Sequence, residues 1–111
     1  MKRGDVVDVL FPFSDLNQLK LRPALVVQSD ALLKNADVVV ACITGNLARL
    51  GPARVLVSLN DALSAGTNLK TDSMILADKL ATIDRKSIQK VRGVFKGMHL
   101  VDVALRIALA L

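Results

Sequence analysis

Hydrophobic and polar residues alternate, and β-branched residues cluster, in several short stretches of this chain. Five of these stretches predict β-strands, at residues 5–11, 24–28, 38–44, 54–59 and from 73 to 76 or beyond. The links between them contain glycine, proline, asparagine, aspartate and serine, which are turn formers. Because these links hold no long helical pattern, the sequence favours an antiparallel, strongly curved sheet or small barrel over alternating parallel strands and helices.

The pattern changes near Asp84, and the rest of the chain predicts a short helical turn, a strand and a helix. Asp84 suits the N-cap of the turn, and residues 88–95 fit the strand. From Met98 onward apolar residues cover most sides of a helix, so this helix must pack on the sheet or be shared with a dimer partner. The expected fold class is therefore mainly β with short helices (α+β), in a single domain over residues 1–111.

Composition and charge narrow the classes of function. Hydrophobic residues make up 52% of the chain, no apolar run is long enough to span a bilayer, and the start has no signal-peptide core. A soluble, cytoplasmic protein without a membrane partner is therefore expected. One cysteine and one histidine exclude an internal disulfide and a His/Cys zinc site. The net charge of +5 favours nucleic acid as the partner, although such an excess also serves as an ordinary solubilising surface.

The most informative residues are Arg22 and Thr44. Pro23 lacks an amide proton and fixes its own φ angle, so it belongs at a strand entrance and holds Arg22 extended. Thr44 ends the next apolar strand. If the two strands pair, a guanidinium and a hydroxyl converge on one patch that suits a phosphodiester. Taken singly, an arginine before proline is usually a solvated loop charge, and a threonine at a strand end is usually a turn former.

Five sequence blocks in register make the chain resemble a known family. They are Arg-Gly-Asp-Val-Val at 3–7, Arg-Pro-Ala-Leu-Val-Val at 22–27, Ala-Cys-Ile-Thr at 41–44, Asp-Ser-Met-Ile-Leu at 72–76 and Lys-Leu-Ala-Thr-Ile-Asp at 79–84. With these blocks and its hydrophobic ending, the chain resembles the MazF/PemK (Kid-like) toxins of bacterial type II toxin–antitoxin systems over essentially its whole length. The resemblance implies an SH3-like small antiparallel barrel of the CcdB/PemK type with a C-terminal helix, and a homodimer that a cognate antitoxin neutralises.

The resemblance also implies an activity and a set of site residues. Such toxins are metal-independent, sequence-specific endoribonucleases that cut single-stranded RNA without a cofactor. The Arg of the Arg-Pro block and the Thr that closes the following strand are their catalytic pair, which carries over to Arg22 and Thr44. No metal ligand is expected. The candidate substrate-binding residues are Phe13, Ser14, Asp15, Gln18, Lys20, Asn46 and Ser73.

The first loop departs from the family pattern. Many relatives carry Gly-Ser-Glu-Gln before the Arg-Pro, whereas residues 13–21 here read Phe-Ser-Asp-Leu-Asn-Gln-Leu-Lys-Leu, without glutamate. Asp15 is a candidate general base if this loop folds over the site, and Lys20 is a candidate phosphate ligand. Phe13 either stacks on a base or closes one end of the barrel. This altered loop leaves the RNA sequence that is cut undetermined.

Metal-free RNA cleavage uses the substrate's own 2′-hydroxyl as nucleophile and gives a 2′,3′-cyclic phosphate and a 5′-hydroxyl end. Arg22 suits the stabilisation of charge on the phosphoryl oxygens, and Thr44 suits a hydrogen bond to them, whereas the general base is left unassigned. Two other functions stay open: a CcdB-like toxin that inhibits DNA gyrase without being an enzyme, and an inactive RNA-binding relative.

Two further features have alternative interpretations. Cys42 lies in an apolar strand and fits a small buried hydrophobic residue. A basic cluster near the C-terminal strand fits either a solvated face or a track for the RNA backbone. The cluster consists of Arg85, Lys86, Lys90, Arg92 and Lys96.

Overall fold

The computed structural model describes residues 1–12, 19–32 and 34–111, and it confirms the predicted succession of strands and helix. The elements are β1 (Asp5–Pro12), β2 (Leu19–Val26), β3 (Asp37–Thr44), β4 (Arg54–Val57), β5 (Ser73–Asp84), β6 (Ile88–Val94) and α1 (Met98–Leu109). Three short 3-10 turns lie at Asp30–Leu32, Ala62–Ser64 and Arg85–Ser87. As predicted, Asp84 caps the last of these turns, because its carboxylate accepts a hydrogen bond from the backbone N–H of Lys86 at 2.9 Å.

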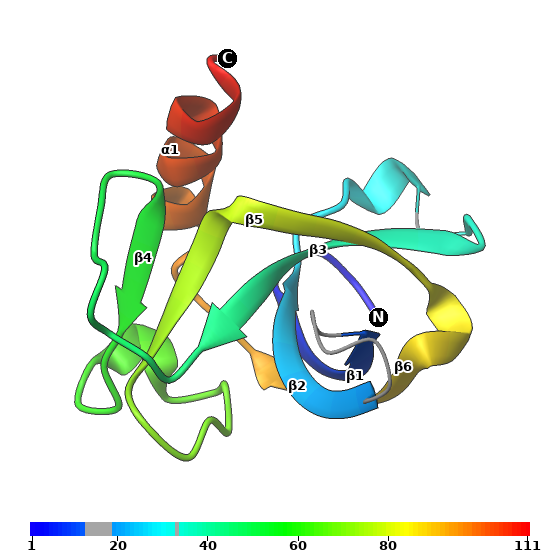
Figure 1. Cartoon of the computed structure of the whole chain (residues 1–111), viewed down its shortest axis with the longest axis horizontal. Coiled ribbons are helices and arrows are strands. Elements are labelled where there is room, and N and C mark those ends of the chain that lie inside the picture. The colour runs from blue at the N-terminus through cyan, green and yellow to red at the C-terminus, as the bar shows by residue number, and fades with distance from the viewer. Residues whose placement is uncertain (13–18, 33) are drawn as a thin grey trace.

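All six strands form one antiparallel sheet in the order β4-β5-β3-β2-β1-β6. Figure 1 shows β5 as a long, strongly bent strand that passes from β4 at one end of the molecule toward the other end. The segment that follows β4 also reaches the end of β6, where Gly66 accepts a hydrogen bond from the backbone N–H of Val94 at 2.8 Å. The predicted antiparallel, curved sheet is thus confirmed.

One strand boundary differs from the prediction in a way that matters for the site. β2 begins at Leu19 and not at residue 24, so Pro23 lies inside the strand and not at its entrance. Pro23 lies opposite Asp8 of β1, whereas the pairing of β2 with β3 starts only at Ala24. A proline is tolerated there because this part of β2 has a paired strand on one side only, so the missing donor breaks no central ladder.

The alternating strand residues fill two hydrophobic clusters, one on each face of the curved sheet. One cluster includes Val6, Leu25 and Ile75 and is covered by α1, whose Val101 and Ala104 are buried. The other cluster lies on the opposite face and contains Val7, Val9, Ala24, Val26, Val38, Val40 and Ile83. The C-terminal helix therefore packs on the sheet, which is one of its two predicted roles. Within the described residues, no helix has the length and apolar character needed to cross a membrane.

Candidate active site

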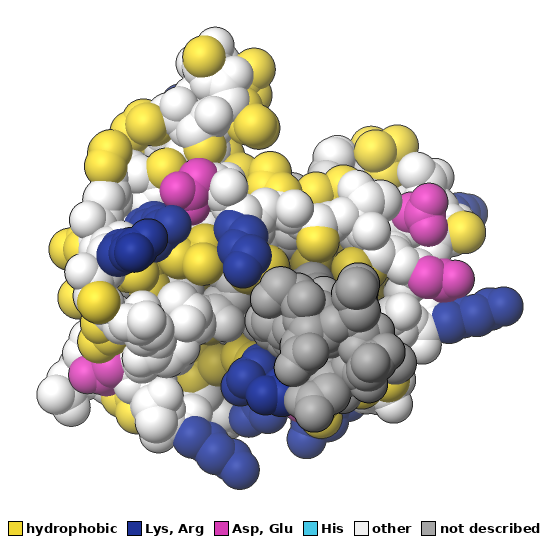
Figure 2. Space-filling view, viewed as in Figure 1, with side chains coloured by type: hydrophobic (Ala, Val, Ile, Leu, Met, Phe, Trp, Pro, Cys, Tyr) yellow, Lys and Arg dark blue, Asp and Glu magenta, His cyan; other side chains and the backbone are white. Residues whose placement is uncertain are grey.

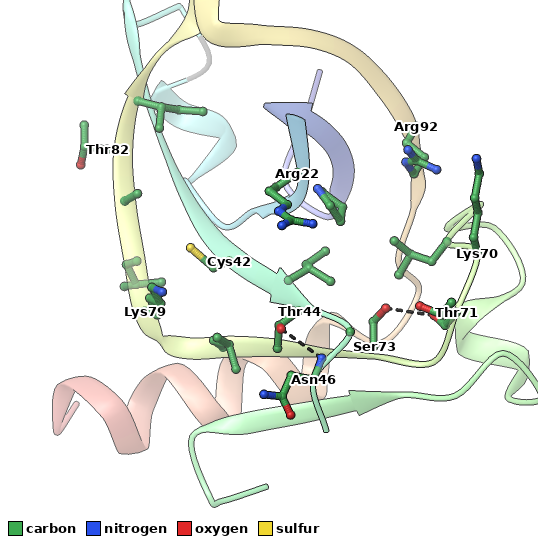
Figure 3. Close-up of a pocket in the computed structure, with 18 residues that line it drawn as sticks. Arg22, Cys42, Thr44, Asn46, Lys70, Thr71, Ser73, Lys79, Thr82 and Arg92 are labelled. Carbon is green, nitrogen blue, oxygen red and sulfur yellow. Dashed lines mark hydrogen bonds between the residues drawn. The ribbon is translucent and has the colours of Figure 1, made fainter. Parts of the chain in front are cut away.

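The structure brings Arg22 and Thr44 to the same place. β2 and β3 are antiparallel neighbours, with Ala24 opposite Cys42, and Arg22 and Thr44 each lie two residues beyond that pair in the direction in which the two strands separate. Both residues line one cavity of about 940 Å³. In Figure 3 the Arg22 side chain lies in the middle of this cavity and Thr44 lies at its lower edge. The predicted pairing of these two strands, and the shared patch that it implies, are confirmed.

The cavity combines an apolar wall with a cationic rim. Its apolar residues include Pro23, Ile43, Leu69, Leu76 and Leu80. Among the described lining residues there are four cations and no carboxylate: Arg22, Lys70, Lys79 and Arg92. Figure 2 shows several Lys and Arg side chains on one face of the molecule, with hydrophobic side chains between them. Such a cavity suits a ligand that carries phosphates and flat apolar groups.

The hydroxyl of Thr44 is oriented by its own turn. Its Oγ1 accepts a hydrogen bond from the backbone N–H of Asn46 at 3.1 Å, which leaves the hydroxyl proton to be donated elsewhere. The side-chain oxygen of Asn46 in turn accepts from the backbone N–H of Ala48 at 3.0 Å. Thr44 is half-buried and Asn46 is exposed. The turn after β3 thus fixes one donor at the edge of the cavity.

Ser73 lies in the wall, and its donor is already used. It is 4% exposed, and its Oγ donates to the backbone carbonyl of Thr71 at 2.9 Å, as the dashed line in Figure 3 shows. This bond joins the start of β5 to the loop that carries Lys70 and Thr71, two lining residues that the sequence did not single out. In this structure Ser73 therefore supports the wall.

Arg92 is held by a buried carboxylate. Asp8 is only 1% exposed, and Arg92 donates to both of its oxygens, from Nε at 2.9 Å and from Nη2 at 3.1 Å. Arg92 and Asn68 also bond to each other, since the guanidinium donates to the backbone carbonyl of Asn68 at 3.2 Å and the Asn68 amide donates to the carbonyl of Arg92 at 2.7 Å. This network ties β1, β6 and the loop at 68–71 together, so Arg92 does not belong to a purely solvated face.

The remaining predicted site residues have different outcomes. Phe13, Ser14, Asp15 and Gln18 lie outside the described residues. Lys20 is exposed on β2, two residues before Arg22, and it is not among the described residues that line the cavity.

Cys42 is half-buried in the cavity wall and not fully buried as expected. Burial raises the pKa of its thiol above the ordinary value of 9.0, and the positive charge of Lys79 partly opposes this rise. The thiol is therefore protonated at neutral pH and acts as a small apolar group in the wall.

Comparison with known families agrees with this geometry. The sequence profile of the PemK-like, MazF-like toxins of type II toxin–antitoxin systems matches residues 2–111. The chain belongs to this family. No match was found among curated proteins.

Solved structures of the toxin family share the fold. An endoribonuclease in complex with its cognate antitoxin, from a mycobacterial species, has a TM-score of 0.77 and 25% identity, over 100% of this chain and 96% of that chain. The Mycobacterium tuberculosis toxin MazF-mt6 has a TM-score of 0.76 and 20% identity, over 96% and 97%. MazF from Deinococcus radiodurans has a TM-score of 0.70 and 22% identity, over 100% and 97%.

Proposed function

We propose that this toxin is a metal-independent, sequence-specific endoribonuclease that cuts single-stranded RNA, with Arg22 and Thr44 as its catalytic residues. The observation that carries the proposal is the meeting of these two residues, from neighbouring strands, in a cavity whose described charged residues are all cationic. Membership of the PemK-like, MazF-like toxins supports it, as does the similarity in fold to an endoribonuclease. RNA fits both parts of the cavity, because its anionic phosphates suit the cationic rim and its flat bases suit the apolar wall.

The chemistry is a transesterification within the RNA. The 2′-oxygen forms a bond to the adjacent phosphorus while the bond from phosphorus to the 5′-oxygen breaks, which gives a 2′,3′-cyclic phosphate and a 5′-hydroxyl. The Arg22 guanidinium holds the nonbridging oxygens as their charge grows, because its planar donors fit two oxygens at once. The Thr44 hydroxyl, oriented by Asn46, donates a further hydrogen bond at the same phosphate.

The two proton transfers are assigned only in part. Arg22 serves as a charge stabiliser, because a guanidinium offers hydrogen-bond donors and no acceptor. The described lining residues include neither aspartate nor histidine. Asp15 in the first loop is our candidate for the base.

The test is cleavage of a long single-stranded RNA in EDTA, with the new 5′-hydroxyl ends mapped. We expect the wild type to cut, Arg22→Ala to lose on the order of a hundredfold to a thousandfold in rate, and Thr44→Ala to lose less. Thr44→Ser keeps the hydroxyl and should keep most of the activity, and Lys34→Ala removes an exposed charge outside the cavity and should cut normally. Cleavage that survives both alanine substitutions would refute the catalytic pair.

The same experiment separates the alternatives. RNA left intact by the wild type, together with inhibited DNA supercoiling by gyrase, would point to a CcdB-like inhibitor. Intact RNA that is nevertheless bound would point to an inactive RNA-binding relative. The pairing of Arg22 with Thr44 at one cavity favours the nuclease, because an inhibitor of gyrase needs no such pair.

We also propose that the toxin acts in the cytoplasm as a homodimer and is neutralised by a cognate antitoxin. A shallow groove between α1 and β4 is lined by Leu56, Leu100 and Val103, and these three side chains are 48%, 41% and 54% exposed. These three exposed apolar side chains lie beside the core and favour a second copy as their cover. Sedimentation of the wild type and of Val103→Lys tests this: a dimer that the substitution splits is expected, and a wild-type monomer would refute it.

A further inference from the structure

A bulge in β5 shapes one side of the cavity. Ala41 of β3 lies opposite Leu80, but the next residue, Cys42, lies opposite Leu76, so β5 carries extra residues at 77–79. A bulge of this kind bends a strand and changes the direction of its side chains, and bulges occur often beside active sites. The last residue of this bulge is Lys79, which lines the cavity.

The bulge is fixed from its outer side by β4. The buried Ala77 donates its backbone N–H to the carbonyl of Ala53 at 3.0 Å. Asp78 is bound by Arg54, whose Nε lies 3.3 Å from Oδ1 and whose Nη2 lies 3.4 Å from Oδ2. The bulge is thus bound to Arg54 through Asp78, while the next residue, Lys79, lines the cavity. We call Arg54 and Asp78 the bulge clamp.

Lys79 differs from Arg92, on the opposite wall, in its hydrogen-bond and ion-pair partners. Figure 3 shows Lys79 on one side of Arg22, with Arg92 and Lys70 on the other. The guanidinium of Arg92 is engaged by Asp8 and Asn68, whereas Lys79 makes no ion pair or hydrogen bond within the described part of the chain. An exposed ammonium held at a cavity without a protein partner is suited to an anionic ligand.

We propose that Lys79 is a further substrate-binding residue, which holds an RNA phosphate next to the one at Arg22, and that the bulge clamp is the pair that positions it. This inference rests on the proposed ribonuclease function. The clamp acts through Lys79 and touches no substrate itself. The positive charge of Lys79 also acts on the Cys42 thiol in the cavity wall, where it lowers the pKa that burial raises.

The first experiment measures binding of a long single-stranded RNA whose 2′-hydroxyl groups are methylated, so that it cannot be cut. Lys79→Gln should weaken binding on the order of threefold to tenfold at low salt and reduce the slope of log K against log salt by about 0.7, the value for one lost phosphate contact on single-stranded RNA. Lys79→Arg should restore most of both quantities. The control Lys34→Gln removes one exposed charge outside the cavity and should leave the slope within error of the wild type.

The second experiment tests the clamp. Arg54→Gln should weaken RNA binding less than Lys79→Gln does, and it should have no further effect in the double variant Arg54→Gln/Lys79→Gln. Losses that simply add would show that Arg54 does not act through Lys79. The third measurement needs no RNA: the pKa of the Cys42 thiol, followed by thiolate absorbance, should rise in Lys79→Gln and stay unchanged in Lys34→Gln.

These outcomes separate the inference from the proposed function. A wild type that cuts RNA, with an unchanged salt slope in Lys79→Gln, overturns the inference and leaves the nuclease intact. A wild type that binds RNA through Lys79 but does not cut it overturns the nuclease and leaves the inference intact. A wild type that binds no RNA overturns both.

Discussion

Gly93 lies where β6 meets the segment after β4, and replacing it by alanine tests how the cavity wall is held. An added Cβ would overlap the carbonyl oxygen of Gly66 and would lie 2.7 Å from both the carbonyl carbon and the carbonyl oxygen of Thr67. These are backbone atoms, so no side-chain rotation relieves the contact. The whole segment must move, and with it the loop that carries Lys70 and Thr71 to the cavity.

The magnitude follows from what this movement breaks. Forcing a methyl group into a packed site costs about 1–3 kcal/mol. The shift also strains the bond from Val94 N–H to Gly66 and the reciprocal bonds between Asn68 and Arg92, each of which contributes about 1 kcal/mol. The unfolded chain of the alanine variant is also less flexible, which raises the free energy of unfolding by roughly 0.5–1 kcal/mol. If the shift weakens these three bonds by about half, the net loss of unfolding free energy is about 1.5–4 kcal/mol, or roughly 8–20 °C in Tm for a domain of this size.

Urea and thermal unfolding, followed by circular dichroism, measure this loss. Gly51→Ala is the matched control, because nothing lies within 4 Å of the Cβ that it adds, and it should change the free energy by less than about 0.5 kcal/mol. RNA cleavage by Gly93→Ala, measured below its transition, should fall as well, because the wall is displaced. If Gly93→Ala unfolds at the same urea concentration as Gly51→Ala, the close packing of the segment at 66–67 against β6 is refuted.

Two other predictions concern the buried groups near the cavity. Asp8→Asn leaves Arg92 without its anionic partner and should lower the unfolding free energy, measured by urea titration, by about 2–3 kcal/mol. Lys90→Gln removes an exposed ammonium 3.8 Å from Asp8 and should lower the unfolding free energy by less than about 0.5 kcal/mol. Equal costs would contradict the dominant role of Arg92. Burial raises the pKa of the Cys42 thiol, so its contribution to stability is complete below 9.0 and is lost as the pH rises through the higher folded-state pKa. Urea titrations at increasing pH should show the wild type losing stability relative to Cys42→Ala above 9.0, and parallel curves would contradict this.

The strands and the capped turn could be predicted from the sequence because their determinants are local. The alternation of residues at 38–44 and the aspartate at position 84 lie within the elements that they specify. The start of β2 differs from the prediction because a proline ordinarily lies at a strand entrance. Only the position of β3 explains why Pro23 is accepted inside the strand. Strand order depends on contacts between distant parts of the chain, which no local pattern contains.

The candidate site divides in the same way. The meeting of Arg22 and Thr44 could be predicted because it requires only that two consecutive strands pair. Asp8 and Arg92 are 84 residues apart, and their contact requires β1 and β6 to be neighbours. The sequence contains one indication of this contact: Asp8 stands alone in the apolar stretch at 6–10, and a buried carboxylate requires a cationic partner. The position of Lys79 depends on a bulge, which a strand pattern does not reveal.

The place of β1 in the sheet has a consequence for how the toxin is made. β1 lies between β2 and β6, so one neighbour of the first strand follows soon after it, while the other is synthesised only at residues 88–94. Until then one edge of β1 is open, and Asp8 has no Arg92 to neutralise it. Arg22 and Thr44 therefore exist in the nascent chain well before the wall beside them can form. The complete cavity can therefore form only after β6 has been synthesised, when most of the chain already exists.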